Sequence, residues 1–510
     1  MMLSLIAHLA WLIVLAPLLA ALWIGFSFMV GWNRGEEGES GTARVAIGAI
    51  STSTLLLLLF SVLYLFGIRF DTLEGMTWIN SGIIHIELAL LLDGLSLSIA
   101  TALSIVLLLV VRFSVNYLHR EAAFQRFFMM LMLLCLGMEL IWLSGNAALT
   151  FVGWELAGVS SYLLIAYNWK RPTATLNAQR AFITNRIGDA GFILALFAAL
   201  YFFNTLDWQA LALQVPAMKL NSLPLSLLTV GLLIAALAKS AQLPFSSWIT
   251  HALEGPTPSS AVYYGSVMVH AGVYLLLRAA PLMETTPALS YLIGLVGLLT
   301  VLYAWLSAQV QTDIKSSLIF ATLMQVGLML IEIALGWYTL ATIHLILHAW
   351  WRAYQFLHAP SFMQLTHYPA PPTPRWLTHK TFLRNAALQR FWLDSLTHAL
   401  LVKPTQALSK DAQVLEDHVI DRLTGTPFAH QPAIGENDNV TLRAGIPGQF
   451  LAQLARGAEW MEAYLTTEVG SSSFLKKILY IERYLEIIER LLRQPHYLIV
   501  LITISLVIVL

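Results

Sequence analysis

Charged residues are scarce in this chain. Only 11% of its 510 residues are Asp, Glu, Lys or Arg, whereas 58% are hydrophobic. A soluble domain usually carries about 25% charged residues, so the composition excludes an ordinary soluble protein and predicts a polytopic, all-α membrane protein. The net charge is zero by count, which removes the electrostatic argument for nucleic-acid binding.

Cysteine and catalytic motifs are also nearly missing. The single cysteine, Cys135, lies in an apolar run, so the chain cannot form an intrachain disulfide or a thiolate cluster for a metal. The sequence has no nucleotide-binding loop, no CxxC pair and no nucleophile elbow. We therefore expect no enzyme chemistry, no cofactor and no metal site in this chain.

Long apolar runs, by contrast, are abundant. Runs of about 20 residues are long enough to cross a bilayer as helices. Eleven spans are predicted, near residues 8–30, 45–67, 86–111, 125–143, 147–168, 182–204, 225–243, 259–280, 288–310, 315–333 and 337–358. Lys and Arg concentrate after the odd-numbered spans, so the positive-inside rule predicts an external N-terminus and a cytoplasmic tail after the eleventh span.

The character of the chain changes near residue 366, at the proline-rich segment HYPAPPTPRW. Residues 380–424 predict an amphipathic helix with Phe391, Leu393, Leu396, Leu400 and Leu401 on one side. Residues 425–447 predict a loop, residues 474–493 a second amphipathic helix, and residues 497–510 a hydrophobic end that is short for a span. We expect this tail to bind a partner; lying along the membrane surface is the alternative.

The stretch from Leu232 to Ala261 carries the strongest functional signal. Lys239 lies deep in an apolar run, where a charged side chain costs several kcal/mol unless it is paired or faces water. The helix is predicted to break at Pro244, and the segment ends in a turn that contains Gly255, Pro256 and Pro258. Broken helices at membrane depth are typical of ion paths.

Two carboxylates belong with this lysine. Glu155 lies in the middle of a span and is predicted to be the counter-ion of Lys239, in a pair that one arriving proton can shift; a static structural pair is the alternative. Asp189 begins the next span close to Arg186 and is predicted to be an entrance group or, equally, an interfacial cap.

Four further side chains extend the set. His344 and His348 are spaced i, i+4 on one helix face, and histidine can pass protons through its two ring nitrogens. Such a pair can also bind zinc, but the sequence shows no third ligand, so we expect no metal here. His270 is predicted to continue a polar axis, or only to hydrogen-bond a neighbour. Lys315 lies at the start of a span; the alternative to a role in the path is that its side chain only extends to the membrane surface. A hydrated row of these groups would carry protons laterally in the membrane.

Several segments resemble the antiporter-like membrane subunits, the family that includes the large distal subunit of complex I and the A subunit of Mrp sodium/proton antiporters. They are SVNYLHREAAFQRFF, GWELAGVSSYLLI, AFITNRIGDAGF, AKSAQLPFSSWITHALEGPTPSSA, MVHAGVYLLLR and HLILHAWWRAYQFL. The resemblance implies two inverted repeats with broken helices. It implies proton-pathway roles for Glu155, Asp189, Lys239, His344 and His348, and matches Lys315 to a basic residue of the family.

The chain also departs from that family. Tyr264 stands where the family usually has a histidine, and Arg352 replaces a lysine; because arginine keeps its proton in proteins, Arg352 is predicted to act as a fixed charge. The second repeat is expected to be truncated. The predicted domains are residues 1–85 (N-terminal helices), 86–281 (first repeat), 282–365 (truncated second repeat) and 366–510 (tail).

The tail segments FWLDSLTHALLVKPTQAL and HVIDRLTG are similar to DabB, the membrane subunit of an inorganic-carbon accumulation complex. That resemblance implies a bacterial inner-membrane location, proton or sodium flow through this chain, and a zinc-containing partner like DabA that resembles a β-carbonic anhydrase. Two alternatives stay open: a proton/sodium antiporter or complex I module, and an inert membrane anchor for a cytoplasmic enzyme.

Overall fold

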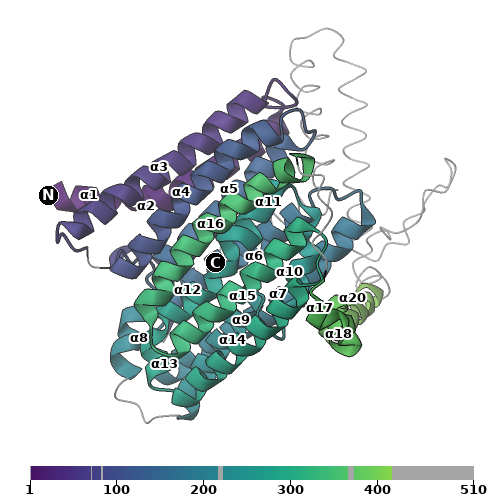
Figure 1. Ribbon diagram of the computed structural model, residues 1–510. Helices are drawn as coiled ribbons and strands as arrows, with labels where there is room; N and C mark the ends of the chain where they lie inside the picture. Colours follow the sequence, from purple (N-terminus) through teal and green to yellow (C-terminus); the bar gives the residue numbers. More distant parts are fainter. Residues whose placement is uncertain (1, 71, 82–83, 216–221, 366–372, 416–510) are drawn as a thin grey trace, which may run out of the picture. The chain divides into compact units, whose positions relative to one another are not determined.

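The computed structural model describes residues 2–70, 72–81, 84–215, 222–365 and 373–415 (Figure 1). The described residues fall into two units, one that runs up to Thr397 and one that begins at His398. They are mostly helical, which confirms the predicted polytopic helical fold. The predictions for residues 425–447, 474–493 and 497–510 lie outside the described residues.

The N-terminal helices form a bundle around one central helix. The bundle consists of α1 (Met2–Leu9), α2 (Trp11–Val30), α3 (Glu39–Leu65), α4 (Gly94–Tyr117) and α5 (Phe124–Leu143). Helices α2, α3 and α4 all pack against α5, which is buried over nearly its whole length. The apolar composition of α5 on every side explains its central position, because a helix that is hydrophobic all round is a buried one.

A β-hairpin, which the sequence analysis did not predict, precedes α4. Strands β1 (Leu73–Ser81) and β2 (Ile84–Leu90) pair antiparallel, with Leu73 opposite Leu90. The expected span at 86–111 is therefore wrong in its first part. His85 and Glu87 alternate with apolar neighbours, which is the period of a strand, and the helix begins only after Asp93, whose side chain caps Ser96 N at 2.8 Å.

The middle of the chain continues with α6 (Ala147–Ile165), α7 (Pro172–Ala198), the π-helical turn η1 (Ala199–Phe203), α8 (Trp208–Gln214) and α9 (Leu223–Lys239). Glycine pairs allow the helices to approach closely. A Cβ at Gly153 of α6 would lie 2.6 Å from the carbonyl oxygen of Gly137 in α5, and one at Gly231 of α9 would lie 2.5 Å from that of Gly191 in α7. Small residues at helix crossings are typical of membrane bundles.

The helix that carries Lys239 is broken. Helix α9 ends at Lys239, and a non-helical stretch follows before the short helix α10 (Ser247–His251). The chain then forms short pieces: η3 (Ala252–Glu254), α11 (Thr257–Ser260), η4 (Ala261–Ser266), η5 (Met268–His270), α12 (Ala271–Arg278) and α13 (Ala280–Glu284). Pro244 lies in the first interruption, and Gly255 and Pro256 lie in the second.

Three long helices complete this part: α14 (Pro287–Ala308), α15 (Ile314–Ala334) and α16 (Tyr338–Leu365). They lie beside one another in chain order (Figure 1). Within the described ranges, nine helices are long and apolar enough to cross a membrane, and α9 is a shorter apolar helix. Of the eleven predicted spans, the one at 86–111 begins as a strand, and those at 225–243 and 337–358 correspond to α9 and α16, which are not among these nine. The pairing into inverted repeats and the domain boundaries stay predictions.

Residues after the proline-rich break return to the helical bundle. Helices α17 (Arg375–Thr378), α18 (Thr381–Leu388) and α19 (Leu393–Thr397) flank the 3-10 turn η6 (Arg390–Trp392). Trp376 stacks on Trp305 of α14, and Phe391 contacts Tyr303 edge-on. The expected single helix over residues 380–424 is wrong, because the three residues of η6 have positive φ and turn the chain. The second unit begins with η7 (His398–Val402) and α20 (Lys403–Leu415).

Candidate functional site

Lys239 is the last residue of α9 and is 1% exposed. Its Nζ donates a hydrogen bond to the carbonyl oxygen of Trp154 at 3.0 Å and lies 4.9 Å from the centre of the Trp154 indole ring. A backbone acceptor and an aromatic face both favour a cation. The structure therefore accommodates a charged lysine between α9 and α6.

Glu155 and Asp189 are both near Lys239, but neither forms a direct ion pair with it. Arg186 of α7 pairs with Glu155 of α6, and its Nη2 lies 2.8 Å from Oδ2 of Asp189. The predicted Glu155–Lys239 pair is therefore wrong in its partner. The reason is geometric: Arg186 has the longer side chain with a forked group that bridges two carboxylates.

Gly158 explains how two cations share this space. A Cβ at Gly158 would lie 3.1 Å from Nη2 of Arg186 and 3.4 Å from Nζ of Lys239. A glycine on α6 thus leaves room for both groups. Together, Glu155, Arg186, Asp189 and Lys239 form a set that we call the lysine cluster, which balances two carboxylates against two cations.

A second set lies on the broken helix and α16. Nε2 of His270 lies 3.0 Å from Nδ1 of His348, and Arg352 donates through Nε to Nε2 of His348 at 3.2 Å. Arg352 also donates to Gln355 at 2.7 Å. We call His270, His344, His348 and Arg352 the histidine chain. His270 and His348 are buried, and Arg352 is 7% exposed.

The hydrogen bonds of the histidine chain assign its protons. Because arginine only donates, Nε2 of His348 must accept, and a neutral His348 carries its proton on Nδ1. His348 then donates to Nε2 of His270, whose own proton lies on Nδ1. Arg352 thus orients the hydrogen bonds of the histidine chain toward the broken helix.

His344 lies one turn before His348 on α16 and has different partners. Its Nδ1 lies 2.9 Å from Oε1 of Glu332, and its Nε2 lies 3.0 Å from Oε1 of Gln325, both in α15. The His344 and His348 rings are 6.1 Å apart. His344 thus joins α16 to α15 through both of its ring nitrogens.

The lysine cluster and the histidine chain meet at the backbone. Ser240, which follows Lys239, donates to the carbonyl oxygen of Val269, which precedes His270, at 2.7 Å. A Cβ at Gly272 would lie 2.4 Å from Oγ of Ser240, so only a glycine permits this contact. The two sets are therefore held in one fixed arrangement.

Two predicted residues lie elsewhere. Lys315 donates to Oγ1 of Thr257 at 2.9 Å, and Tyr117 shares that hydroxyl at 3.0 Å; Thr257 lies between Pro256 and Pro258 in the broken helix. Tyr264 donates to the carbonyl oxygen of Ala252, within the same broken helix. Lys315 therefore contacts the second interruption rather than the histidine chain.

The sequence analysis did not single out three ionisable residues that the structure places in the helical bundle. Glu332 of α15 and the fully buried Glu139 of α5 lie in apolar runs, which is the signal that identified Glu155. Arg186 was named only as a neighbour of Asp189. The described residues contain no group of three or more His, Cys, Asp or Glu side chains placed to hold a metal ion.

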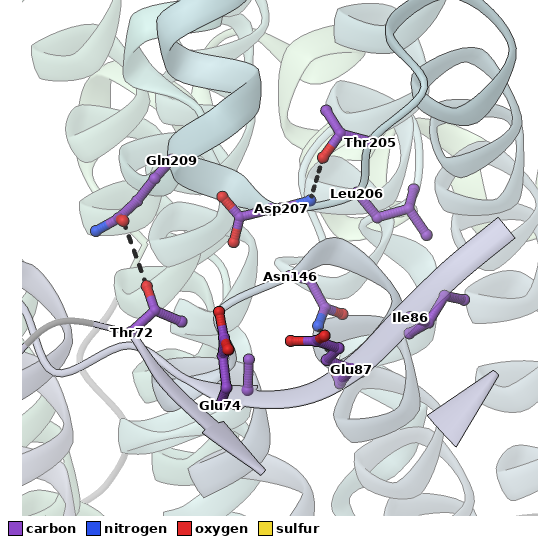
Figure 2. A pocket seen from close by; sticks show the side chains of 10 residues that line it. Thr72, Glu74, Ile86, Glu87, Asn146, Thr205, Leu206, Asp207 and Gln209 are labelled. Carbon is purple, nitrogen blue, oxygen red and sulfur yellow. Dashed lines mark hydrogen bonds between the residues drawn. The ribbon is translucent and has the colours of Figure 1, made fainter. Parts of the chain in front are cut away.

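A pocket of about 580 Å³ lies beside the hairpin, and no residue of the lysine cluster or the histidine chain is among those that line it (Figure 2). Glu74, Glu87 and Asp207 give it an acidic lining. Its polar groups serve local structure: Asp207 caps α8 through Ala210 N at 2.7 Å, and Asn146 donates to the carbonyl oxygen of Glu87 at 2.7 Å. We assign it no role in ion transfer.

Two family models and several known proteins match parts of this chain. The family model "NADH:quinone oxidoreductase/Mrp antiporter, TM" matches residues 144–371, and "NADH-Ubiquinone oxidoreductase (complex I), chain 5 N-terminus" matches residues 78–128. The NADH-ubiquinone oxidoreductase chain 5 of Allomyces macrogynus is 34% identical over 355 residues, which are 70% of this chain and 54% of the relative. The NADH-quinone oxidoreductase subunit L of Escherichia coli is 33% identical over 347 residues, 68% of this chain and 56% of the relative.

Solved structures share the fold. The Mrp complex from Dietzia sp. contains a chain with a TM-score of 0.56 and 23% identity, over 70% of this chain and 37% of that one. The archaeal membrane-bound sulfane sulfur reductase contains a chain with a TM-score of 0.61 and 20% identity, over 90% of this chain and 94% of that one. The chain spans about half the length of the curated relatives. Over residues 78–128 and 144–371, the chain is therefore similar to the antiporter-like membrane subunits of complex I and the Mrp antiporters.

Proposed function

We propose that this chain conducts protons through the membrane as the ion-translocating subunit of a multisubunit complex. The observation that carries the proposal is the hydrogen-bonded histidine chain, which joins α16 to the broken helix beside Lys239. Intramembrane ionisable groups are expensive, and they mark ion pathways by default. The comparisons support the proposal, because relatives are subunits of complex I and a solved Mrp complex shares the fold.

The residues suggest how a proton moves. In the lysine cluster, Arg186 stays charged, so the groups that exchange protons are Lys239, Asp189 and Glu155. A proton that neutralises one carboxylate weakens the attraction that holds the proton on Lys239, which then releases it. In the histidine chain, His270 passes a proton when it releases its Nδ1 proton and takes the Nδ1 proton of His348 on Nε2. A further proton then returns to Nδ1 of His348, while Arg352 keeps Nε2 of that ring as an acceptor.

For the coupled reaction, we infer inorganic-carbon accumulation. The cation flow would drive hydration of CO2 to bicarbonate by a zinc-containing partner that resembles a β-carbonic anhydrase. The support is the similarity of FWLDSLTHALLVKPTQAL and HVIDRLTG to the DabB tail. Purification of the chain with its native partners tests this inference: a co-purifying zinc protein supports it, whereas complex I or Mrp subunits would favour a redox-linked pump or a sodium/proton antiporter.

Proton flux into membrane vesicles, followed with a pH-sensitive dye, tests conduction. Lys239→Ala and Glu155→Ala are each expected to abolish protonophore-sensitive flux while the protein level stays normal, because each breaks the charge balance of the lysine cluster. Arg44→Ala is the matched control, since Arg44 is an exposed charge on α3 that bonds only within its own helix in the described contacts. Wild-type flux in both cluster variants would show that the lysine cluster does not carry the protons, whereas a wild-type chain without flux would favour the inert-anchor alternative.

A further inference from the structure

A group of polar side chains joins the broken helix to the segment after the proline-rich break. Ser247 of α10 donates to Oγ1 of Thr397 in α19 at 2.9 Å. His251, at the other end of α10, places Nε2 3.3 Å from Oδ2 of Asp394. Arg390 donates both to Oγ1 of Thr250 at 2.8 Å and to Oδ2 of Asp394 at 3.1 Å. We call this set the α10–α19 contact.

The neighbours of Asp394 favour its charged form. Burial raises the pKa of this carboxyl, but the hydrogen bond and charge of His251 and the charge of Arg390 outweigh burial and hold the pKa below its ordinary value. Asp394 is therefore ionised at neutral pH. The side chain is half-buried, and its Oδ2 contacts both His251 of α10 and Arg390 of η6, so removal of the carboxylate weakens two contacts at once.

The turn that presents Arg390 is strained. Arg390, Phe391 and Trp392 are consecutive non-glycine residues with φ of 51°, 54° and 55°. The left-handed conformation is unfavourable for residues other than glycine, and such strain persists only where the surroundings determine it. The contact of Phe391 with Tyr303 and the ion pair of Arg390 supply those surroundings.

The other side of α10 reaches the lysine cluster. Nε1 of Trp248 donates to the carbonyl oxygen of Ala238 at 2.9 Å, across the interruption of the helix. Ala238 directly precedes Lys239, and Trp248 is 1% exposed. One short helix thus contacts the backbone beside Lys239 through Trp248. It contacts α19 through Ser247 and His251, and η6 through Thr250. The second unit begins at His398, the residue after Thr397.

We propose that the α10–α19 contact is a rigid link that transmits movement of the broken helix at Lys239 to the second unit. The link rests on the proposed conduction of protons. It gives Asp394 a positioning role: the carboxylate touches neither Lys239 nor the histidine chain in the described contacts, and it acts by fixing α10 to α19. A rigid link predicts that the contact stays closed while the protein works.

The first test uses the full-length chain in native membranes with its partners. A cysteine at Lys403, an exposed position at the start of α20, carries an environment-sensitive fluorophore; the native Cys135 is buried and will not react readily. A pH gradient is imposed, and both proton flux and fluorophore response are recorded. Asp394→Asn is expected to keep the flux and to reduce the response about tenfold, the factor that loss of one charged hydrogen bond produces.

Glu36→Gln is the matched control, because Glu36 forms an exposed ion pair with Arg120 at 2.9 Å, far from α10 in the sequence. It is expected to leave flux and response unchanged. An unchanged response in Asp394→Asn, or an equal loss of flux and response, overturns the link. A wild-type protein without flux overturns the proposed function and the link with it, so the two failures are distinguishable.

The second test asks whether the contact stays closed. The pair Ser247→Cys and Thr397→Cys places two thiols where two hydroxyls now touch. Oxidation to a disulfide is expected to preserve both flux and fluorophore response, with each single variant as control. Loss of the response on oxidation, reversed by reductant, would show that the contact must open, and would overturn a rigid link.

Discussion

Nε2 of His270 lies 3.0 Å from Nδ1 of His348, although the two residues are 78 positions apart in the chain. The contact joins the broken helix to α16 and places two histidine rings in sequence, with centres 5.2 Å apart. His344 continues the row on α16 and contacts Glu332. The proposed path thus depends on a pairing between residues that the sequence separates widely.

His270→Asn is expected to stop proton flux without loss of folded protein. The asparagine oxygen can still accept a hydrogen bond from His348, which avoids the ~1–3 kcal/mol cost of an unsatisfied buried donor. An amide cannot, however, release one proton and accept another as an imidazole does. Dye-monitored flux in vesicles measures the effect. Tyr264→Phe is the comparison and should keep most of the flux, since Tyr264 bonds within the broken helix; equal losses in both variants would argue against a special role for His270.

Arg352→Lys and Arg352→Gln are expected to differ. Lysine keeps a positive donor near Nε2 of His348 and should retain part of the protonophore-sensitive flux. Glutamine removes the fixed charge and offers an acceptor as well as a donor, so His348 is no longer held in one tautomer. We expect impaired coupling or a cation leak, seen with a pH dye in de-energised vesicles. If Arg352→Gln matches wild type in both assays, Arg352 is a packing residue.

Two glycines of α6 should respond differently to alanine. At Gly158, a methyl group would lie 3.1 Å from Nη2 of Arg186, so it shifts this guanidinium of the lysine cluster and should lower flux at a normal protein level. At Gly153, it would lie 2.6 Å from the backbone of Gly137, which cannot move without separating α5 from α6. Gly153→Ala should therefore lower the yield of folded protein, measured by size-exclusion chromatography in detergent.

The sequence predicted much of the site because a charge in an apolar run is visible without a structure. Lys239, Glu155 and His348 were found in this way. It could not assign partners, because the rotation of each helix decides which side chains face each other. The sequence analysis paired Glu155 with Lys239 because their charges are opposite. In the structure, α6 packs on α7 so that Glu155 forms its ion pair with Arg186.

Two errors in the fold have local causes. The run from Ile86 to Leu92 is apolar enough to resemble a helix start, yet the alternation around His85 and Glu87 marks a strand, and Asp93 sets the helix boundary. The helix predicted over residues 380–424 has a suitable apolar pattern, but tertiary contacts of Phe391 stabilise a left-handed turn that no local propensity favours.

Asp93→Asn tests a charge outside the bundle interior. Burial raises the pKa of Asp93, but hydrogen bonds and charge from Arg278 outweigh burial and lower it. A lowered folded pKa means that the stabilisation is complete above the unfolded value of about 3.9 and is lost as the pH falls through the folded pKa. Arg278 donates to both carboxylate oxygens, at 2.5 and 3.0 Å, so the variant should lose ~1–3 kcal/mol at neutral pH.

Thermal unfolding in detergent measures this loss at neutral and at acid pH. The difference between wild type and Asp93→Asn should persist from neutral to mildly acid pH and shrink only in strong acid. Asp313→Asn is the control, since Asp313 caps α15 through Ser316 N at 2.8 Å on an exposed surface and should cost about 1 kcal/mol or less. A difference that grows as the pH falls would contradict the assigned sign.

Truncation of the tail at two positions separates packing from partner binding. The chain ended after Thr397 keeps α17–α19, with the Trp376–Trp305 stack and the α10–α19 contact. We expect it to fold, to conduct protons and to lose its partner, measured by pull-down from detergent extracts. The chain ended at Pro374 also exposes Tyr303 and leaves Thr250 and His251 without Arg390 and Asp394, so its thermal stability should fall as well. If the chain ended after Thr397 retains the partner fully, the docking surface lies on the membrane helices and not on the tail.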